Sequence, residues 1–422
     1  MKFSFVLLML FTMQITFAEQ VKYDERTKSL YKNYSDRIGQ VIVIEEISGK
    51  KSSFGSGFQI NSAGYLATNY HVISKVVHHP DKFRLVFEND NDIRDSLSIV
   101  GFDVINDLAI LHNENASDKY LTINTETQNK GTKLYSLGNP KDLGMSIIEG
   151  TYNGMLEDRR KENIFFSGSL NPGMSGGPAI NKNGEVVGIN VSKSGEQLSF
   201  LVPAKYLEVL RTKIDSVGAF DEENYDAIIE EQLYKNQNEF MSYLLDSEWE
   251  TEAFGEAMIT KKLSYFFHDW GNTKLNPEAL FDITYSGSYT KDDVYVSSDM
   301  NTGSISIRFE WMQSDELNSI QFYNMYKGRF NRYIRPDRSI EEDRSEFVNK
   351  TDFVKIAGKD FMTKLAVRQY KKYPQLYDMV FLAALLEYDK KGLILKFSLS
   401  GISRENGTAF LNKFLETIQW QN

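Results

Sequence analysis

The chain has 422 residues, 41% of them hydrophobic and 25% charged, which is an ordinary balance for a globular protein of two or three domains and excludes disorder as its main state. Its 48 Lys and Arg residues face 58 Asp and Glu residues, and the formal charge of -10 provides no basic field for nucleic acid or an anionic membrane. The sequence contains no cysteine, so disulfide scaffolds, thiol catalysis and cysteine-ligated metal sites are excluded.

The first eighteen residues predict a cleaved secretory signal. Lys2 supplies the positive start, residues 3–11 are almost wholly apolar, and Thr16-Phe17-Ala18 form a small-x-small cleavage site. The apolar run is far shorter than the roughly 20 residues that span a bilayer, which disfavours a retained anchor, and no later segment is long enough. We therefore expect an exported protein, periplasmic or secreted, without an integral membrane span after cleavage, and an N-terminal segment at 19–37.

Short β-type runs separated by Gly, Asn and Asp fill the chain from Gln40 to about Val202. Many short, closely spaced strands predict a barrel or a sandwich and not a parallel sheet. Asn181-Lys182-Asn183-Gly184 between apolar runs predicts a hairpin turn. The clearest strand candidates are 41–44, 85–87, 108–111 and 186–189.

The second half of the chain reads differently. Pro203 precedes a predicted helix at 204–214, and apolar residues near helical spacing predict another helix within 228–244. Alternation at 305–311 predicts a strand, 389–392 joins two strand-like runs at 380–388 and 393–399, and 410–418 predicts a closing helix. These patterns predict an α+β domain at 217–422, of unassigned fold and unknown role, after a mostly β half.

The segment from Asn171 to Pro178, with the sequence NPGMSGGP, carries the strongest chemical signal. A serine nucleophile needs an exposed hydroxyl on a tight turn and backbone N–H groups that stabilise the oxyanion formed on attack. Glycines at 173, 176 and 177 permit that backbone path around Ser175. The alternative is a Gly-rich hairpin turn without chemistry.

Partners for Ser175 occur upstream. His71 follows the strand-like run 64–70, and Asp107 precedes the apolar run 108–111, so a base and its orienting carboxylate are both available. The chain order His, Asp, Ser is that of double-barrel serine proteases. Asp103 is the rival carboxylate, but it lies four residues further from the run that would bury it.

These residues resemble the trypsin-fold peptidases of the HtrA/Deg group over about residues 38–212. The resemblance implies a trypsin-like double six-stranded β-barrel at 38–216, with His71 as general base and acid, Asp107 holding the imidazole tautomer, and Ser175 as nucleophile. It also implies that backbone N–H groups of Gly173 and Ser175 form the oxyanion hole. The matching motifs are GSGF at 55–58, TNYHV at 68–72, DLAIL at 107–111, GNP at 138–140, GMSGGP at 173–178 and NGEVVGIN at 183–190.

Two departures from the group limit what is carried over. Met174 stands where the group usually has Asn and trypsins have Asp, so it cannot form an ion pair with a new amino terminus. Zymogen activation by such an ion pair is therefore not expected. Nothing after residue 212 is similar to the PDZ modules typical of the group, so peptide-tail recognition is not transferred either.

The expected substrate pocket carries no charge. Ser169 stands six residues before the nucleophile and is followed by Leu170, so no carboxylate is available to bind Lys or Arg. We expect an apolar P1 preference, with Leu170 and also Leu198 and Ser199 contacting substrate. By family resemblance, glutamyl endopeptidases use an extra histidine in the strand that binds substrate. The corresponding stretch here, 197–203, contains no histidine, which disfavours that class.

The other histidines are interpreted without chemistry. His78 and His79 are expected in a surface loop, since adjacent histidines diverge and no second ligand cluster lies nearby. His112 is expected to end a buried strand, and His268 to lie in an aromatic core. No metal or other cofactor is expected.

The leading hypothesis is an exported serine endopeptidase that acts on protein or peptide substrates through an acyl-enzyme. The competing hypothesis is a catalytically silent scaffold whose C-terminal domain binds a protein or envelope partner, since a fold never guarantees activity. Retention of all three triad positions favours the enzyme. The oligomeric state is not readable from the sequence.

Overall fold

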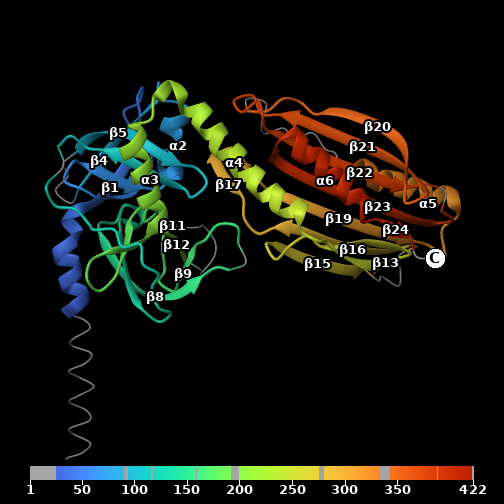
Figure 1. Ribbon diagram of the computed structural model, residues 1–422, viewed down its shortest axis with the longest axis horizontal. Coiled ribbons are helices and arrows are strands. Elements are labelled where there is room, and N and C mark those ends of the chain that lie inside the picture. Colours follow the sequence, from blue (N-terminus) through green and yellow to red (C-terminus); the bar gives the residue numbers. More distant parts are fainter. Residues whose placement is uncertain are drawn as a thin grey trace, which may run out of the picture. The chain divides into compact units, whose positions relative to one another are not determined.

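The computed structural model describes residues 25–89, 94–115, 117–157, 159–191, 199–274, 280–332, 343–386 and 388–420 (Figure 1). The predicted signal at 1–18 lies outside these residues. Contact between Cα atoms divides the chain into two compact units, one of residues 1–157 and 162–222, the other of residues 158–161 and 223–422. Within the described residues, no helix is both long and apolar enough to cross a bilayer.

The first unit contains two closed antiparallel barrels of six strands each, as the sequence predicts. A helix at 25–34 and a short 3-10 turn, η1 (Ser35–Arg37), precede them. The first barrel has the strand order β1-β2-β3-β6-β5-β4. Its strands are β1 (Ile38–Glu45), β2 (Lys51–Gln59), β3 (Tyr65–Thr68), β4 (Phe83–Glu88), β5 (Arg94–Asp103) and β6 (Leu108–His112), and helix α2 (Tyr70–His78) follows β3.

The second barrel has the order β10-β11-β12-β9-β8-β7. Its last strand leads directly into helix α3 (Ala204–Val217), which packs against strands of both barrels through Leu207, Leu210 and Ile214. The strands are β7 (Lys133–Gly138), β8 (Ser146–Met155), β9 (Ile164–Phe166), β10 (Pro178–Ile180), β11 (Val186–Val191) and β12 (Ser199–Pro203), and the 3-10 turn η2 (Pro140–Asp142) follows β7.

The apolar runs chosen from the sequence become buried strands. Val41, Ile42 and Val43 in β1 are fully buried, and so are the four residues 108–111 of β6. Both faces of these strands are covered, one by the barrel interior and the other by helices and neighbouring loops, which explains continuous apolar runs in place of strict alternation. The turn predicted at 181–184 joins β10 to β11, and Gly184 adopts a φ of 83°, which favours glycine.

The second unit is an α+β domain, as predicted, built on a seven-stranded antiparallel sheet of order β15-β16-β19-β23-β22-β21-β20 (Figure 1). A three-stranded sheet of order β13-β14-β24 and the two-stranded pair β17-β18 accompany it. The seven strands are β15 (Phe267–Lys274), β16 (Asp282–Thr290), β19 (Ile305–Gln313), β20 (Val348–Ile356), β21 (Lys359–Gln369), β22 (Tyr377–Leu385) and β23 (Lys391–Ile402). The smaller strands are β13 (Glu250–Phe254), β14 (Ala257–Lys262), β17 (Val294–Ser297), β18 (Met300–Thr302) and β24 (Gln419–Trp420).

Helices cover both faces of the seven-stranded sheet. After the 3-10 turn η3 (Glu222–Asn224), α4 (Tyr225–Asp246) and α6 (Arg404–Glu416) pack on one face through an aromatic core that includes Phe397, Phe410 and Phe414. On the other face α5 (Ser319–Arg332) packs through Phe322 and Tyr326. The period-2 pattern of β19 directs alternate side chains to these two different cores.

A buried carboxylate lies on the α5 face of the sheet. Glu310 of β19 is 1% exposed, and its two oxygens bind Arg308 Nη2 at 2.8 Å and Arg329 Nε at 2.9 Å. Arg329 in turn donates to the hydroxyl of Tyr285 at 2.8 Å. Two arginines therefore compensate one carboxylate, the usual condition for burying a charge.

Residues 158–161, between β8 and β9, belong to the second unit. The side chain of Arg160 is 9% exposed, lies 3.8 Å from Asp292 Oδ1 and covers the Phe240 ring at 4.4 Å from its centroid. Arg159 donates to the Lys291 carbonyl at 2.7 Å, and the backbone N–H of Lys161 donates to Asp292 Oδ2 at 3.1 Å. This short segment is thus held by an ion pair, a cation–π contact and main-chain hydrogen bonds.

Candidate active site

His71 lies in the first turn of α2, directly after β3. Asn69, the residue that caps this helix, is extended and fully buried. The helix begins here because β3 ends at Thr68 and the apolar residues Val72, Ile73 and Val77 then bury one helical face. The predicted position of His71 at the end of a strand-like run is therefore refined, since the residue belongs to the helix that follows.

Asp107 is held in a turn between β5 and β6 with a φ of 57°, in the left-handed region. Aspartate tolerates this region better than most residues, but the conformation still has a cost. The Asn69 side-chain amide donates to the Asp107 carbonyl at 2.8 Å, which stabilises the turn. The rival carboxylate, Asp103, instead accepts hydrogen bonds from the backbone and side-chain N–H groups of Asn106, at 2.9 and 2.7 Å.

The carboxylate of Asp107 binds His71 with both oxygens. Oδ2 lies 2.7 Å from His71 Nδ1, and Oδ1 accepts the backbone N–H of His71 at 2.9 Å. Burial alone would lower the pKa of His71, but the charge of Asp107 and its hydrogen bond outweigh burial, and the pKa of His71 is raised. A carboxylate in this position fixes the ring orientation and leaves Nε2 available for proton transfer.

The loop that carries Ser175 approaches the start of α2. A Cβ built on Gly176 would lie 2.3 Å from Thr68 Oγ1 and 3.1 Å from the backbone nitrogen of Asn69. Gly176 has a φ of 86° as well, so both space and conformation require glycine. Chain neighbours of Ser175 and of His71 therefore meet, and Ser175 itself is 6% exposed.

The expected substrate-contacting residues occupy different settings. Leu170 is half-buried, and its side chain packs with Met155 against the core of the second barrel. Ser199 begins β12, is 6% exposed, and its hydroxyl accepts the backbone N–H of Leu170 at 3.0 Å. Leu198 lies outside the described residues. Ser169 is exposed, and no charged group enters the wall from residues 169 and 170.

Structure and expectation differ for two of the other histidines. His78 ends α2 instead of lying in a loop, and its Nε2 is 3.1 Å from the hydroxyl of Tyr70. His268 is exposed on β15, where its ring contacts Tyr289, so its placement in an aromatic core was wrong. Hydrophobic neighbours in sequence misled the prediction because alternate residues of a strand point to opposite sides. His112 ends β6 with its ring against Tyr65, as expected.

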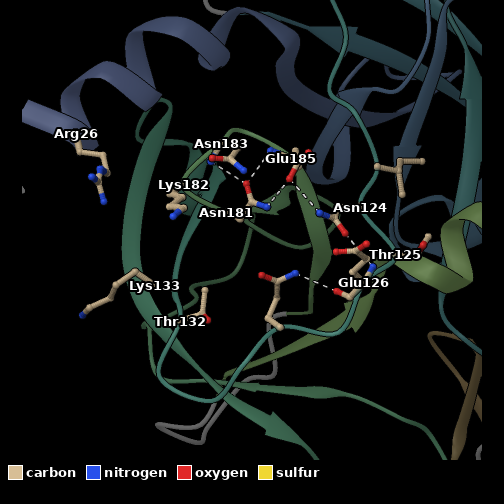
Figure 2. A pocket seen from close by; sticks show the side chains of 12 residues that line it. Arg26, Asn124, Thr125, Glu126, Thr132, Lys133, Asn181, Lys182, Asn183 and Glu185 are labelled. Carbon is tan, nitrogen blue, oxygen red and sulfur yellow. Dashed lines mark hydrogen bonds between the residues drawn. The ribbon is translucent and has the colours of Figure 1, made fainter.

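A hollow of about 840 Å³ lies on the second barrel and is not lined by His71, Asp107 or Ser175 (Figure 2). Figure 2 shows that its polar side chains bind one another: Glu185 Oε2 accepts from Asn181 at 2.7 Å and from Asn124 at 3.0 Å. These hydrogen bonds, that of Asn181 first, lower the pKa of Glu185. The cluster supports the hairpin turn between β10 and β11 and provides no reacting group.

Sequence reasoning assigned no role to two residues that contact the site. Asn69 and Ser56 both stand inside motifs quoted above, yet their partners, the carbonyl of Asp107 and the loop around Ser175, are distant in the sequence. The only sequence signal for them is that polar residues interrupt otherwise apolar or glycine-rich strands. Both are fully buried, which requires hydrogen-bond partners.

Comparison with known proteins finds relatives of the first unit. Residues 55–189 match the family model described as a trypsin-like peptidase domain. The chain is 32% identical over 163 residues to a probable periplasmic serine endoprotease DegP-like of Bartonella henselae, covering 36% of this chain and 31% of the relative. It is 33% identical over 177 residues to the serine endoprotease DegS of Salmonella typhimurium, covering 38% and 47%.

Among solved structures, the serine endoprotease from Yersinia pestis covers 46% of this chain and 68% of its own, with 24% identity and a TM-score of 0.40. The chain spans only about a third to a half of the length of the curated relatives given above. The match to the family model lies within the first unit, and the curated relatives agree with the predicted resemblance to HtrA/Deg peptidases.

Proposed function

We propose that this chain is an exported serine endopeptidase in which Ser175 is the nucleophile, His71 the general base and acid, and Asp107 the residue that orients His71. The observation that carries the proposal is the 2.7 Å contact between Asp107 Oδ2 and His71 Nδ1 beside the glycine-rich loop of Ser175. Curated relatives that are named periplasmic serine endoproteases support both the reaction and the export.

The reaction would proceed by acyl transfer. His71 Nε2 takes the proton of Ser175 Oγ as the oxygen attacks the peptide carbonyl, and Asp107 stabilises the imidazolium that results. The proton then passes to the leaving amine, and water hydrolyses the acyl-enzyme with His71 again acting as base. Backbone N–H groups of Gly173 and Ser175 would stabilise the oxyanion, a contribution typically worth 10²–10³-fold in kcat for each donor.

An apolar P1 residue is the preference that the pocket wall supports. Ser169 and Leu170 bear no charge, and Leu170 is continuous with the apolar core of the second barrel. A Lys or Arg side chain would lose hydration there without gaining a carboxylate partner. Ser199, at the start of β12, completes the proposed wall.

The test uses the full-length protein and a fluorophosphonate probe, which labels only an activated serine. Wild type should be labelled and should hydrolyse unfolded casein after apolar residues, whereas Ser175→Ala should lose both reactions and keep its fold by circular dichroism. Ser167→Ala, an exposed serine on the same barrel, is the matched control and should retain both. An unlabelled wild type would favour a silent scaffold, and a cleavage survey dominated by Lys, Arg or Glu at P1 would refute the pocket assignment.

A further inference from the structure

Ser56 joins the first barrel to the loop of the nucleophile. The residue lies on β2 and is completely buried. Its hydroxyl donates to the Gly173 carbonyl at 2.8 Å and accepts the backbone N–H of Asn139 at 3.0 Å. Its own backbone N–H donates to the Ser175 carbonyl at 2.7 Å. One residue therefore makes three hydrogen bonds to two segments of the second barrel.

Successive carbonyls of the nucleophile loop are all held by donors. The Pro172 carbonyl accepts from Lys141 N at 2.8 Å, the Gly173 carbonyl from Ser56, and the Met174 carbonyl from Gly177 N at 3.1 Å. In a trans peptide the C=O and the following N–H point in opposite directions. Fixing the carbonyls of Pro172 and Met174 thus also fixes the directions of the N–H groups of Gly173 and Ser175, the two proposed oxyanion donors.

The loop needs such external support. Gly173 has a φ of 96°, and glycine has access to many backbone conformations. The peptide between Gly173 and Met174 is held by the Ser56 hydroxyl on its carbonyl and by the bond from Met174 N to the Asn171 carbonyl at 3.0 Å, so removing the hydroxyl removes one of these two restraints. Met174 is buried and uncharged, so it cannot fix the loop by an ion pair. Of the three groups that hold these carbonyls, the Ser56 hydroxyl is the one that belongs to a side chain, and it can be removed by substitution without altering the backbone.

The turn next to Asn139 is itself tied to the first barrel. Asp142, in the 3-10 turn η2, accepts hydrogen bonds from Gln40 Nε2 of β1 at 2.8 Å and from Lys51 Nζ of β2 at 2.9 Å. The same turn supplies Lys141 N to the Pro172 carbonyl. Ser56 and Asp142 therefore form two parallel connections from the first barrel to the loop.

We propose that Ser56 is a positioning residue of the oxyanion hole: its buried hydroxyl, by holding the Gly173 carbonyl and the Asn139 N–H together, keeps the Gly173 and Ser175 N–H groups directed at the developing oxyanion. This inference rests on the proposed peptidase function and deepens it. Ser56 touches no substrate atom and acts only through the loop.

The experiment measures Ser56→Ala against wild type with a peptide substrate and with a peptide boronic acid, whose tetrahedral adduct places an oxygen in the oxyanion hole. The substitution should lower kcat about 100-fold, within the range for loss of an oxyanion donor, and leave KM within twofold. Affinity for the boronic acid should fall by a similar factor, because such adducts mimic the transition state.

Ser136→Ala is the control for the loss of a buried hydroxyl, because Ser136 is equally buried and its hydroxyl donates to Asn190 Oδ1 at 2.8 Å within the second barrel. It should lower stability without changing kcat or boronic-acid affinity. If Ser56→Ala does not fold, Ser56→Cys, whose slightly larger thiol fills the site but donates weakly, should show the same pattern to a smaller degree. A folded Ser56 variant with wild-type boronic-acid affinity would overturn the proposal. Failure of wild type to react with a fluorophosphonate would instead overturn the peptidase function itself.

Discussion

Substitution of Asp107 by Asn separates the orienting role of this residue from its structural role. The side-chain volume at position 107 is nearly unchanged, and asparagine tolerates the left-handed φ of 57° there. The amide nitrogen can only donate, so the Nδ1 of His71 becomes an acceptor and its proton moves to Nε2. That is the nitrogen that must accept the proton of Ser175, so the base is in the wrong tautomer.

The expected loss is about 10⁴-fold in kcat, the size seen when this carboxylate is neutralised in serine proteases, and it corresponds to about 5 kcal/mol of transition-state stabilisation. The pH dependence provides a second measure. In wild type the raised pKa of His71 should shift the acid limb of the labelling rate to higher pH than an ordinary histidine would give, because the base must be neutral. Without Asp107 burial alone remains, so the pKa should fall and the acid limb should shift to lower pH.

The assay is the second-order rate of fluorophosphonate labelling between about pH 5 and pH 9, which needs no knowledge of the natural substrate. Asp103→Asn is the matched control, since its carboxylate only accepts hydrogen bonds from Asn106 within the same turn. Asp103→Asn should keep the labelling rate within a few-fold of wild type and should leave the acid limb of its pH profile unshifted. The reasoning fails if Asp107→Asn keeps a tenth of the wild-type rate, if its acid limb stays fixed, or if Asp103→Asn has the larger effect.

Two further substitutions test the loop and the second unit. Gly173→Ala places a Cβ 2.5 Å from the Asn139 carbonyl and should abolish labelling, whereas Gly131→Ala, with nearly the same φ of 94° but open space around it, should keep labelling and lose only some stability. Glu310→Gln removes the buried carboxylate charge that Arg308 and Arg329 both bind and should destabilise the second unit by about 3 kcal/mol, towards the lower end for a broken buried pair. All four tryptophans follow residue 222, so tryptophan fluorescence during urea unfolding reports on the second unit alone. The control is Asp360→Asn, which breaks the exposed ion pair between Asp360 and Lys355 and should unfold like wild type.

The barrels could be predicted because burial on both sides leaves a local record in the sequence. Runs such as Val41–Ile44 and Leu108–Leu111 are apolar throughout and became fully buried strands apart from Ile44, which is 6% exposed. His71, Asp107 and Ser175 were chosen because each stands beside such a run or a glycine-rich turn. These signals are local, so they can be recognised in the sequence before the fold is known.

Contacts between distant segments left no such record. The hydroxyl of Ser56 and the carbonyl of Gly173 are 117 residues apart, so the positioning role proposed for Ser56 could not be read from spacing. In the second unit, strands β19, β22 and β23 were predicted, but the edge strand β20 was not, because it is exposed at eight of its nine residues and shows no apolar alternation. An edge strand with solvent on both faces buries neither face, so its sequence does not alternate between apolar and polar residues.

The passage of residues 158–161 through the second unit means that the polypeptide crosses between the units three times, after residues 157, 161 and 222. Cleavage by a foreign protease just beyond α3 would therefore yield two fragments that still adhere through Arg159, Arg160 and Lys161. A shortened gene product ending near residue 216 would retain Arg160 but lose both Asp292 and Phe240, its partners. The first unit produced alone would accordingly expose an arginine that the full chain holds at 9% exposure.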